Sequence, residues 1–81
     1  MTKNWTITEN KLTRDIQLGN FNDCMSLVND IAKVADEMNH HPDILIHSFN
    51  RLRISIYTHS ENRITESDHQ LAEKIEKLMG R

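Results

Sequence analysis

The sequence predicts a two-layer α/β (α+β) fold of order β-β-α-β-β-α, with a four-stranded antiparallel sheet packed against two helices. Two runs with the period of a strand precede a run with the period of a helix, and the same succession then repeats. The connections between these runs are short, which favours antiparallel neighbours and helices on one face of the sheet. The chain of 81 residues has only two glycines and one proline and no visible linker. Residues 1–81 are therefore expected to form a single domain.

The first two strands are expected at residues 5–9 and 11–18, with Asn10 in the turn between them. Residues 5–9 alternate and include β-branched side chains. Residues 11–18 place Lys, Thr, Asp and Gln at one parity and three apolar side chains at the other, which are Leu12, Ile16 and Leu18. This is the pattern of a half-buried strand, and Gly19 and Asn20 are expected to end it.

A helix is expected from Asn20 to about His40. Asn20 is a suitable N-cap, and Asp23 favours the positive end of the helix dipole. Pro42 biases the residue before it away from helical geometry, so the helix should end by His40. Apolar residues recur with helical spacing at Phe21, Cys24, Met25, Val28, Ile31, Ala32, Ala35 and Met38.

The third and fourth strands are expected at residues 44–49 and 52–57, joined by a turn at Asn50 and Arg51. A polar loop at residues 59–64 follows. Thr65 then begins the last helix, with Asp68 as its capping-box partner and Gly80 as its C′ glycine. The apolar stripe of this helix consists of Leu71, Ala72, Ile75, Leu78 and Met79. The sheet face away from the helices should be wetter or should contact another subunit.

Composition excludes several classes of protein. The formal net charge is −2, without a basic or acidic block, so neither nucleic-acid binding nor an acidic tail is expected. No apolar run is long enough for a signal peptide or a membrane span. The single cysteine, Cys24, fits a reducing compartment, and we expect a cytoplasmic protein. Hydrophobic residues make up only 37% of the chain, which favours stabilisation by oligomer formation.

Five histidines lie between His40 and His69, and the densest polar cluster surrounds two of them. Asp36 precedes His40 by one helical turn, so its carboxylate is expected to orient that ring and to favour its protonated form. Since Pro42 breaks the helix, His41 can present a second imidazole to the same cavity. Such a group of imidazoles suits proton transfer near neutral pH.

Other interpretations of these residues remain open. Histidines at a helix end can serve only as C-caps. His59 follows a strand, where functional residues are common, but it could be an ordinary loop residue. His47 and His69 are interpreted as surface residues. Adjacent histidines chelate a single ion poorly and no metal-binding motif is present, so no metal and no cofactor are expected.

The spacing of these residues resembles that of the pterin-4a-carbinolamine dehydratase family. The family pattern is an acid, three residues, His-His-Pro, an aromatic, a histidine and an aspartate. Its anchors are met here by Asp36, His40, His41, Pro42, Phe49, His59 and Asp68. Further agreement comes from Trp5, Leu12, Arg14, Asn20, Phe21, Asn39, Tyr57 and Thr58, so the resemblance spans essentially the whole chain.

The resemblance implies a hydro-lyase that dehydrates 4a-hydroxytetrahydropterin to quinonoid dihydropterin, as in tetrahydrobiopterin recycling. By this transfer His40 and His41 form the acid/base pair, His59 holds or protonates the hydroxyl, and Asp36 orients His40. Asp68 is expected to cap the last helix or to orient His59. The resemblance further implies a substrate site made of Asn39, His40, His41, Pro42, Tyr57, Thr58, His59 and Ser60.

This chain departs from the family pattern at two positions near the site. Arg63 stands where the family usually has glycine, and Asp36 replaces a more common glutamate. The low apolar content favours a homodimer or homotetramer that forms through sheet edges or helices. Two alternatives to this dehydratase remain: a protein-binding module that acts as a dimerisation cofactor on the same scaffold, and a related protein that acts on another pterin.

Overall fold

The computed structural model describes residues 4–80, which form four strands, two α-helices and one short 3₁₀-helix. The elements follow in the order β1 (Thr6–Thr8), β2 (Lys11–Gln17), α1 (Phe21–Met38), β3 (Asp43–His47), β4 (Arg51–Ile56), η1 (His59–Glu61) and α2 (Glu66–Leu78). The predicted order β-β-α-β-β-α is therefore confirmed. None of the helices in this part of the chain has both the length and the apolar character to cross a membrane.

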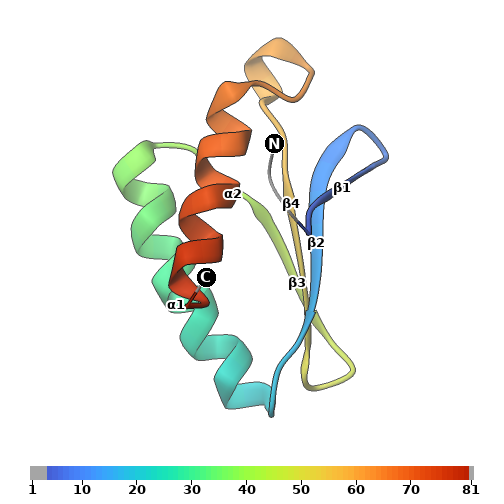
Figure 1. The fold of residues 1–81 in the computed structure, drawn as a ribbon, viewed down its shortest axis with the longest axis vertical. Coiled ribbons are helices and arrows are strands. Elements are labelled where there is room, and N and C mark those ends of the chain that lie inside the picture. Colours follow the sequence, from blue (N-terminus) through green and yellow to red (C-terminus); the bar gives the residue numbers. More distant parts are fainter. Residues whose placement is uncertain (1–3, 81) are drawn as a thin grey trace.

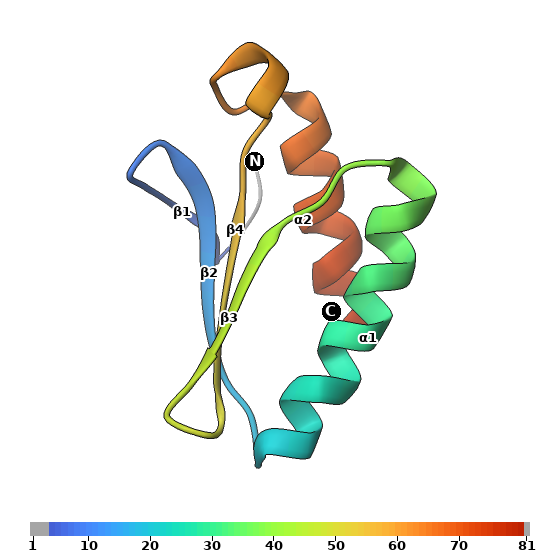
Figure 2. The same ribbon diagram turned by 180° about the vertical axis from the view of Figure 1, so that it is seen from behind.

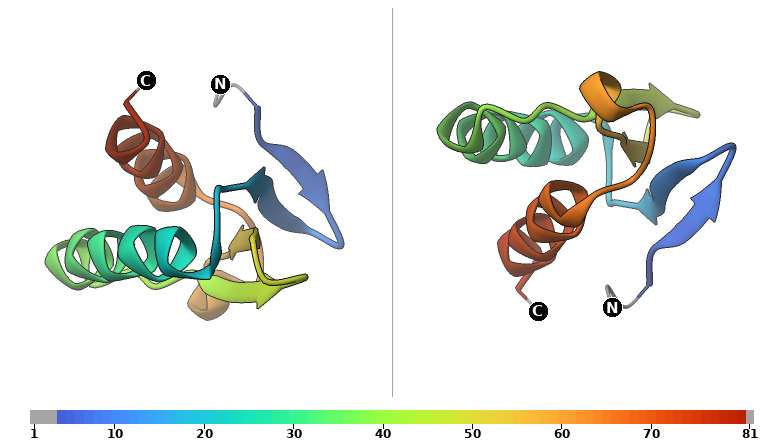
Figure 3. Two further views of the ribbon diagram at one scale, coloured as in Figure 1. Left: turned by 90° about the horizontal axis from the view of Figure 1, so that it is seen from below. Right: turned by 90° about the horizontal axis from the view of Figure 1, so that it is seen from above.

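The four strands form one antiparallel sheet in the spatial order β1-β2-β4-β3. Both helices cover the same face of this sheet, as two opposite views show (Figures 1 and 2). Views from below and above show a sheet layer and a helix layer (Figure 3). The other face of the sheet is left without a covering element. We call it the open face, and it agrees with the expectation of one wetter side.

The ends of the helices follow the capping residues seen in the sequence. The Asn20 side chain accepts a hydrogen bond from the backbone N–H of Asp23 at 2.8 Å. Thr65 and Asp68 form a reciprocal capping box at the start of α2, and Gly80 has a positive φ of 81° just beyond its end. Asn39 ends α1 with a φ of 52°, in the left-handed region. These caps fix where α1 and α2 start and stop.

The turn between β3 and β4 lies earlier than predicted. The predicted strand 44–49 is wrong at its end, because β3 stops at His47 and Arg51 already belongs to β4. Ser48 and Phe49 both have positive φ values, 51° and 53°. Residues other than glycine seldom adopt this conformation, so propensity did not mark these two as turn residues.

The core lies between the helix layer and the inner face of the sheet. Its fully buried aliphatic side chains come from α1, β4 and α2 and are Ile31, Leu52, Ile54, Ile56, Leu71 and Ile75. Glu76 of α2 accepts hydrogen bonds from Trp5 Nε1 at 2.9 Å and from Arg14 Nε at 2.8 Å. This pair of bonds ties the start of the sheet to α2. Thr13 of β2 departs from the expected pattern, because it is buried on the open face, where its hydroxyl donates to the carbonyl of Lys11.

Candidate active site

A pocket of about 370 Å³ opens where the end of α1, the start of β3 and the segment after β4 meet. We call it the imidazole pocket. It is lined by Asn39, His40, His41, Pro42, Asp43, Tyr57, Thr58, His59 and Ser60. All eight residues that the resemblance assigned to a substrate site therefore lie around one hollow, and Asp43 is added to them. The three histidines come from two segments about 20 residues apart that the fold brings together.

Local backbone geometry explains why the adjacent histidines point apart. Asn39 turns the chain into the left-handed region, while the backbone N–H of His40 still donates to Ala35 O at 3.1 Å. Pro42 then favours an extended conformation at His41 and leads into β3. His40 and His41 consequently lie in a short connection between a helix and a strand, and each ring finds a different carboxylate.

The ring of His40 is hydrogen-bonded to Asp68. His40 Nε2 lies 2.5 Å from Asp68 Oδ1, and the Asp68 side chain has no exposed surface. The other oxygen, Oδ2, accepts from the backbone N–H of Thr65 and from the hydroxyl of Thr58, both at 2.7 Å. Burial raises the pKa of Asp68, but the bonds from His40, Thr65 and Thr58 outweigh it and hold this pKa below its ordinary value. Asp68 is therefore an ionised, fully hydrogen-bonded partner of His40.

The ring of His41 is hydrogen-bonded to Asp36, at 2.9 Å from Nε2 to Oδ1. Both side chains are largely exposed, 57% for His41 and 77% for Asp36. The prediction that Asp36 orients His40 is wrong. Because α1 ends at Met38 and Asn39 reverses the chain, the ring of His40 turns toward α2, and Asp36 is left to face His41.

Asp68 has both a capping role and a role toward a histidine, but the histidine differs from the expected one. The capping box with Thr65 is present as predicted. The expected contact with His59 is replaced by the contact with His40, 28 positions away in the sequence. No local pattern marks this pairing, because it depends on how the start of α2 packs against the end of α1.

His59 differs from the other two histidines because no carboxylate of the described residues is its partner. Within residues 4–80 its ring contacts the ring of Tyr57 edge-to-face, with centroids 5.0 Å apart and an interplanar angle of 84°. The hydroxyl of Tyr57 donates to the side-chain oxygen of Asn62, whose left-handed backbone shapes the loop. Tyr57 and Asn62 therefore brace His59, and the ring nitrogens of His59 remain available to a ligand.

The remaining candidate residues lie apart from the imidazole pocket. His47 is on β3 and His69 is on α2, and neither lines this pocket. Cys24 is fully buried in α1, as its place on the apolar stripe predicts. In the described part of the chain, no three side chains of His, Cys, Asp or Glu are grouped so that they could hold a metal ion.

This geometry suits proton transfer to and from a bound molecule. Two imidazoles are each held by a carboxylate through one ring nitrogen, which fixes their tautomer and leaves the other nitrogen for a ligand. The third imidazole is unpaired and faces the same hollow. His40 and His41 are therefore held in positions from which they can exchange protons with a bound molecule.

Comparisons with known proteins identify the family. The family model described as pterin 4 alpha carbinolamine dehydratase matches residues 1–78. This chain belongs to that family. A relative from Sulfolobus acidocaldarius, whose name marks it as a candidate pterin-4-alpha-carbinolamine dehydratase, is 40% identical over 74 residues, which are 91% of this chain and 80% of the relative. A relative of the same name from Chloroflexus aurantiacus is 37% identical over 76 residues, which are 94% of this chain and 81% of the relative.

Two solved structures share the fold of this dehydratase-family chain. A transcriptional coactivator/pterin dehydratase from Brucella melitensis has a TM-score of 0.86 at 27% identity, over 94% of this chain and 82% of the other. A pterin dehydratase-like protein described as a RuBisCO assembly factor in the alpha-carboxysome has a TM-score of 0.73 at 16% identity, over 94% and 87%. At that identity the second similarity concerns the fold alone.

The unusual arginine of this family member lies outside the imidazole pocket. Arg63 Nη2 donates to Glu61 Oε1 at 2.6 Å, and Arg63 is absent from the pocket lining. The left-handed residue in this loop is the preceding one, Asn62, with a φ of 56°. Arg63 itself does not require a conformation that favours glycine, so the loop accommodates it without strain.

Proposed function

We propose that this protein catalyses the dehydration of 4a-hydroxytetrahydropterin to quinonoid dihydropterin and water. The observation that carries the proposal is the convergence of His40, His41 and His59 on one hollow, with a carboxylate behind each of the first two. Family membership supplies the substrate class. The proposed setting is tetrahydropterin recycling in the cytoplasm, consistent with the single buried cysteine.

The reaction requires an acid that donates a proton to the substrate and a base that accepts a proton from it. The bond between C4a and the hydroxyl oxygen breaks as an acid protonates that oxygen, and a base removes the N5 proton as the C4a–N5 double bond forms. In our proposal His40 and His41 exchange protons with the ring, and His59 binds or protonates the hydroxyl. Asp68 supports His40, the role that sequence reasoning had given to Asp36.

Turnover of His40→Ala and His41→Ala tests this assignment. Each substitution is expected to lower turnover at least about tenfold, in the range typical of general acid/base groups. His69→Gln, which removes an imidazole outside the pocket, serves as the matched control and should retain turnover. Thermal unfolding of all variants checks that they fold. Unchanged turnover in both alanine variants would refute the dehydratase proposal, and loss of wild-type turnover in EDTA with restoration by zinc would refute its metal-free chemistry.

We further propose that two copies associate along β3. This strand is at the edge of the sheet, and its Ile44 and Leu45 are exposed. An edge strand with exposed apolar side chains is a template for pairing with another strand. Sedimentation velocity should show a dimer or tetramer for the native chain and a monomer for Leu45→Lys. A native chain that sediments as a monomer at micromolar concentration would refute this association.

A second candidate function is a protein-binding module on the same scaffold. It is favoured by the name of the Brucella relative, which includes a coactivator, and by exposed apolar side chains on α1, among them Phe21 and Met25. An inactive His40→Ala variant that still formed a stoichiometric complex with a partner would separate binding from catalysis. A dehydratase acting on another pterin is distinguished by comparing turnover among 4a-hydroxypterins with different side chains.

A further inference from the structure

The open face of the sheet carries a second hollow, far from the imidazole pocket. It has a volume of about 420 Å³ and is lined from β2, β3 and β4. Its lining residues are Asp15, Ile16, Gln17, His47, Arg51, Leu52 and Arg53. None of these residues lines the imidazole pocket. His47 and Arg51, which line the hollow, flank the β3–β4 turn. This turn and the loop after β4 are at opposite ends of the molecule (Figure 1).

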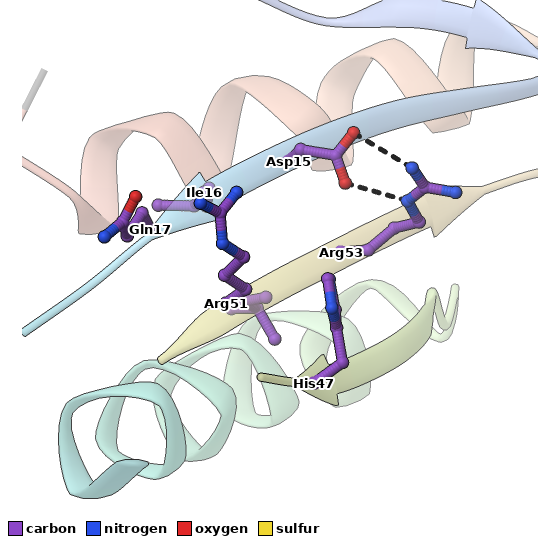
Figure 4. Close-up of a pocket in the computed structure, with 7 residues that line it drawn as sticks. Asp15, Ile16, Gln17, His47, Arg51 and Arg53 are labelled. Carbon is purple, nitrogen blue, oxygen red and sulfur yellow. Dashed lines mark hydrogen bonds and ion pairs between the residues drawn. The ribbon is translucent and has the colours of Figure 1, made fainter. Parts of the chain in front are cut away.

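The sheet register arranges polar side chains of the hollow in rows. Arg51 on β4 is paired with Gln17 of β2 on one side and with His47 of β3 on the other. Two residues further on, Arg53 is paired with Asp15. Residues two apart in a strand share a face, and Figure 4 shows the two arginines and His47 projecting over the same area. Since neighbouring strands are about 4.8 Å apart, the row that centres on Arg51 is about 10 Å wide at the backbone.

The charges in this hollow do not balance. Arg53 binds Asp15 through two hydrogen bonds, of 2.8 and 3.3 Å. The bond from Arg53 holds the pKa of Asp15 below its ordinary value, with the fields of His47 and Arg51 acting in the same direction, so this carboxylate stays ionised. Within residues 4–80 the side chain of Arg51 has no hydrogen bond and no ion pair, and it acts on Asp15 only through its field. Among the residues that line the hollow, one carboxylate therefore faces two guanidinium groups and an imidazole. The field of Glu9, outside the lining, also acts on Arg53.

We propose that this hollow binds a phosphate group, either free or carried by a small molecule, with Arg51 as the principal contact. A guanidinium presents paired N–H donors that match two phosphate oxygens. Gln17 and His47, on the two sides of Arg51, add an amide donor and an imidazole donor. A phosphate group would supply the negative charge that the hollow lacks. The site is independent of the proposed dehydration, because the two hollows share no residue.

The volume of the hollow favours a phosphate monoester over the free ion. A space of about 420 Å³ is within the range of small-molecule sites and exceeds the size of one phosphate ion. The polar side chains that line the site are exposed, and screening by salt therefore limits the affinity. We therefore expect dissociation constants of about 1 mM, which correspond to weak but specific binding.

NMR titration of the native chain tests this site. The probes are inorganic phosphate and ribose 5-phosphate, each compared with sodium chloride at the same ionic strength. The Nε–H signal of Arg51 and the ring signals of His47 should shift and saturate with both phosphates and not with chloride. Arg51→Gln should weaken binding at least about tenfold, as expected for the loss of a bidentate charged contact. Lys74→Gln, which removes an exposed positive charge on α2, is the matched control and should bind like the native chain.

The titrations give distinct outcomes for the two sources of phosphate. Tighter binding of ribose 5-phosphate than of phosphate would support a monoester as the occupant, and equal binding would support the free ion. Equal, unsaturated shifts with phosphate and chloride would overturn the proposal, because they indicate screening alone. Binding by Arg51→Gln that equals native binding would overturn it as well. A dehydratase assay on Arg51→Gln keeps this result separate from the proposed activity, which should be unaffected.

Discussion

Two histidine–aspartate pairs flank the same pocket, and their surroundings differ sharply. The pair of His40 and Asp68 is inside the protein, where Asp68 is fully buried and also binds Thr58 and Thr65. The pair of His41 and Asp36 lies at the surface, where both side chains are largely exposed. The same two functional groups are thus placed once in a rigid, desolvated network and once in water. Burial, rather than the chemistry of the pair, therefore decides how much each pair contributes to the stability of the fold.

The largest expected effect follows from removal of the buried carboxylate. Asp68→Ala should lower the free energy of unfolding by about 3 kcal/mol, since it leaves three donors without their acceptor and unpairs a buried network. Asp36→Ala should lower it by less than about 0.5 kcal/mol, as is usual for exposed pairs. Urea denaturation followed by circular dichroism measures both values. Equal destabilisation by the two substitutions would contradict the comparison.

A smaller effect is expected on turnover when the carboxylates are replaced by amides. Asp68→Asn should lower turnover about tenfold, because partners behind a functional histidine fix its tautomer and basicity. Asp36→Asn should lower it only about twofold, since water screens that contact and the ring of His41 is less confined. Steady-state rates of the two variants, normalised to the folded fraction, give the comparison. A greater loss for Asp36→Asn would show that the exposed pair is the more important one.

The buried carboxylate of Asp68 should also make stability depend on pH. The pKa of Asp68 in the folded protein is below its ordinary value, so in acid the unfolded chain binds more protons than the folded chain does. The contribution of Asp68 is thus complete above about pH 4 and is lost as the pH falls through its folded pKa. Urea midpoints measured from pH 6 to pH 2.5 should fall less steeply for Asp68→Asn than for the native chain. Parallel curves for the two proteins would contradict this linkage.

The smallest expected effect concerns the unpaired imidazole. Tyr57→Leu removes the edge-to-face contact with His59, a contact worth about 1 kcal/mol. The turnover of this variant should fall about threefold, because His59 is placed less precisely. Tyr57→Phe keeps the ring and loses only the bond to Asn62, so its turnover should fall less. Steady-state kinetics of both variants test this. A loss in the phenylalanine variant that matches the leucine variant would assign the effect to the hydroxyl.

The comparison between the pairs also shows where sequence reasoning succeeded. The strand and helix periods predicted the order of the elements, and Asn20, Thr65 and Gly80 marked helix ends that the structure retains. The segments around His40 and Tyr57 line one hollow. The partner of His40 was not predicted correctly, because helical spacing suggested Asp36, four positions away. The spacing applies only while the helix continues, and α1 ends at Met38.

Local features of this protein could be predicted from its sequence: the order of strands and helices, where the helices are capped, and which imidazoles lie at the ends of those elements. These depend on side chains within a few positions of each other. Three features follow from tertiary structure alone: which carboxylate supports His40, why Thr13 is buried, and that the Arg51 side chain has no ion pair among the described residues. Each of these depends on the packing of α2 over the end of α1 or on the register between strands, both of which bring together residues that are distant in the chain.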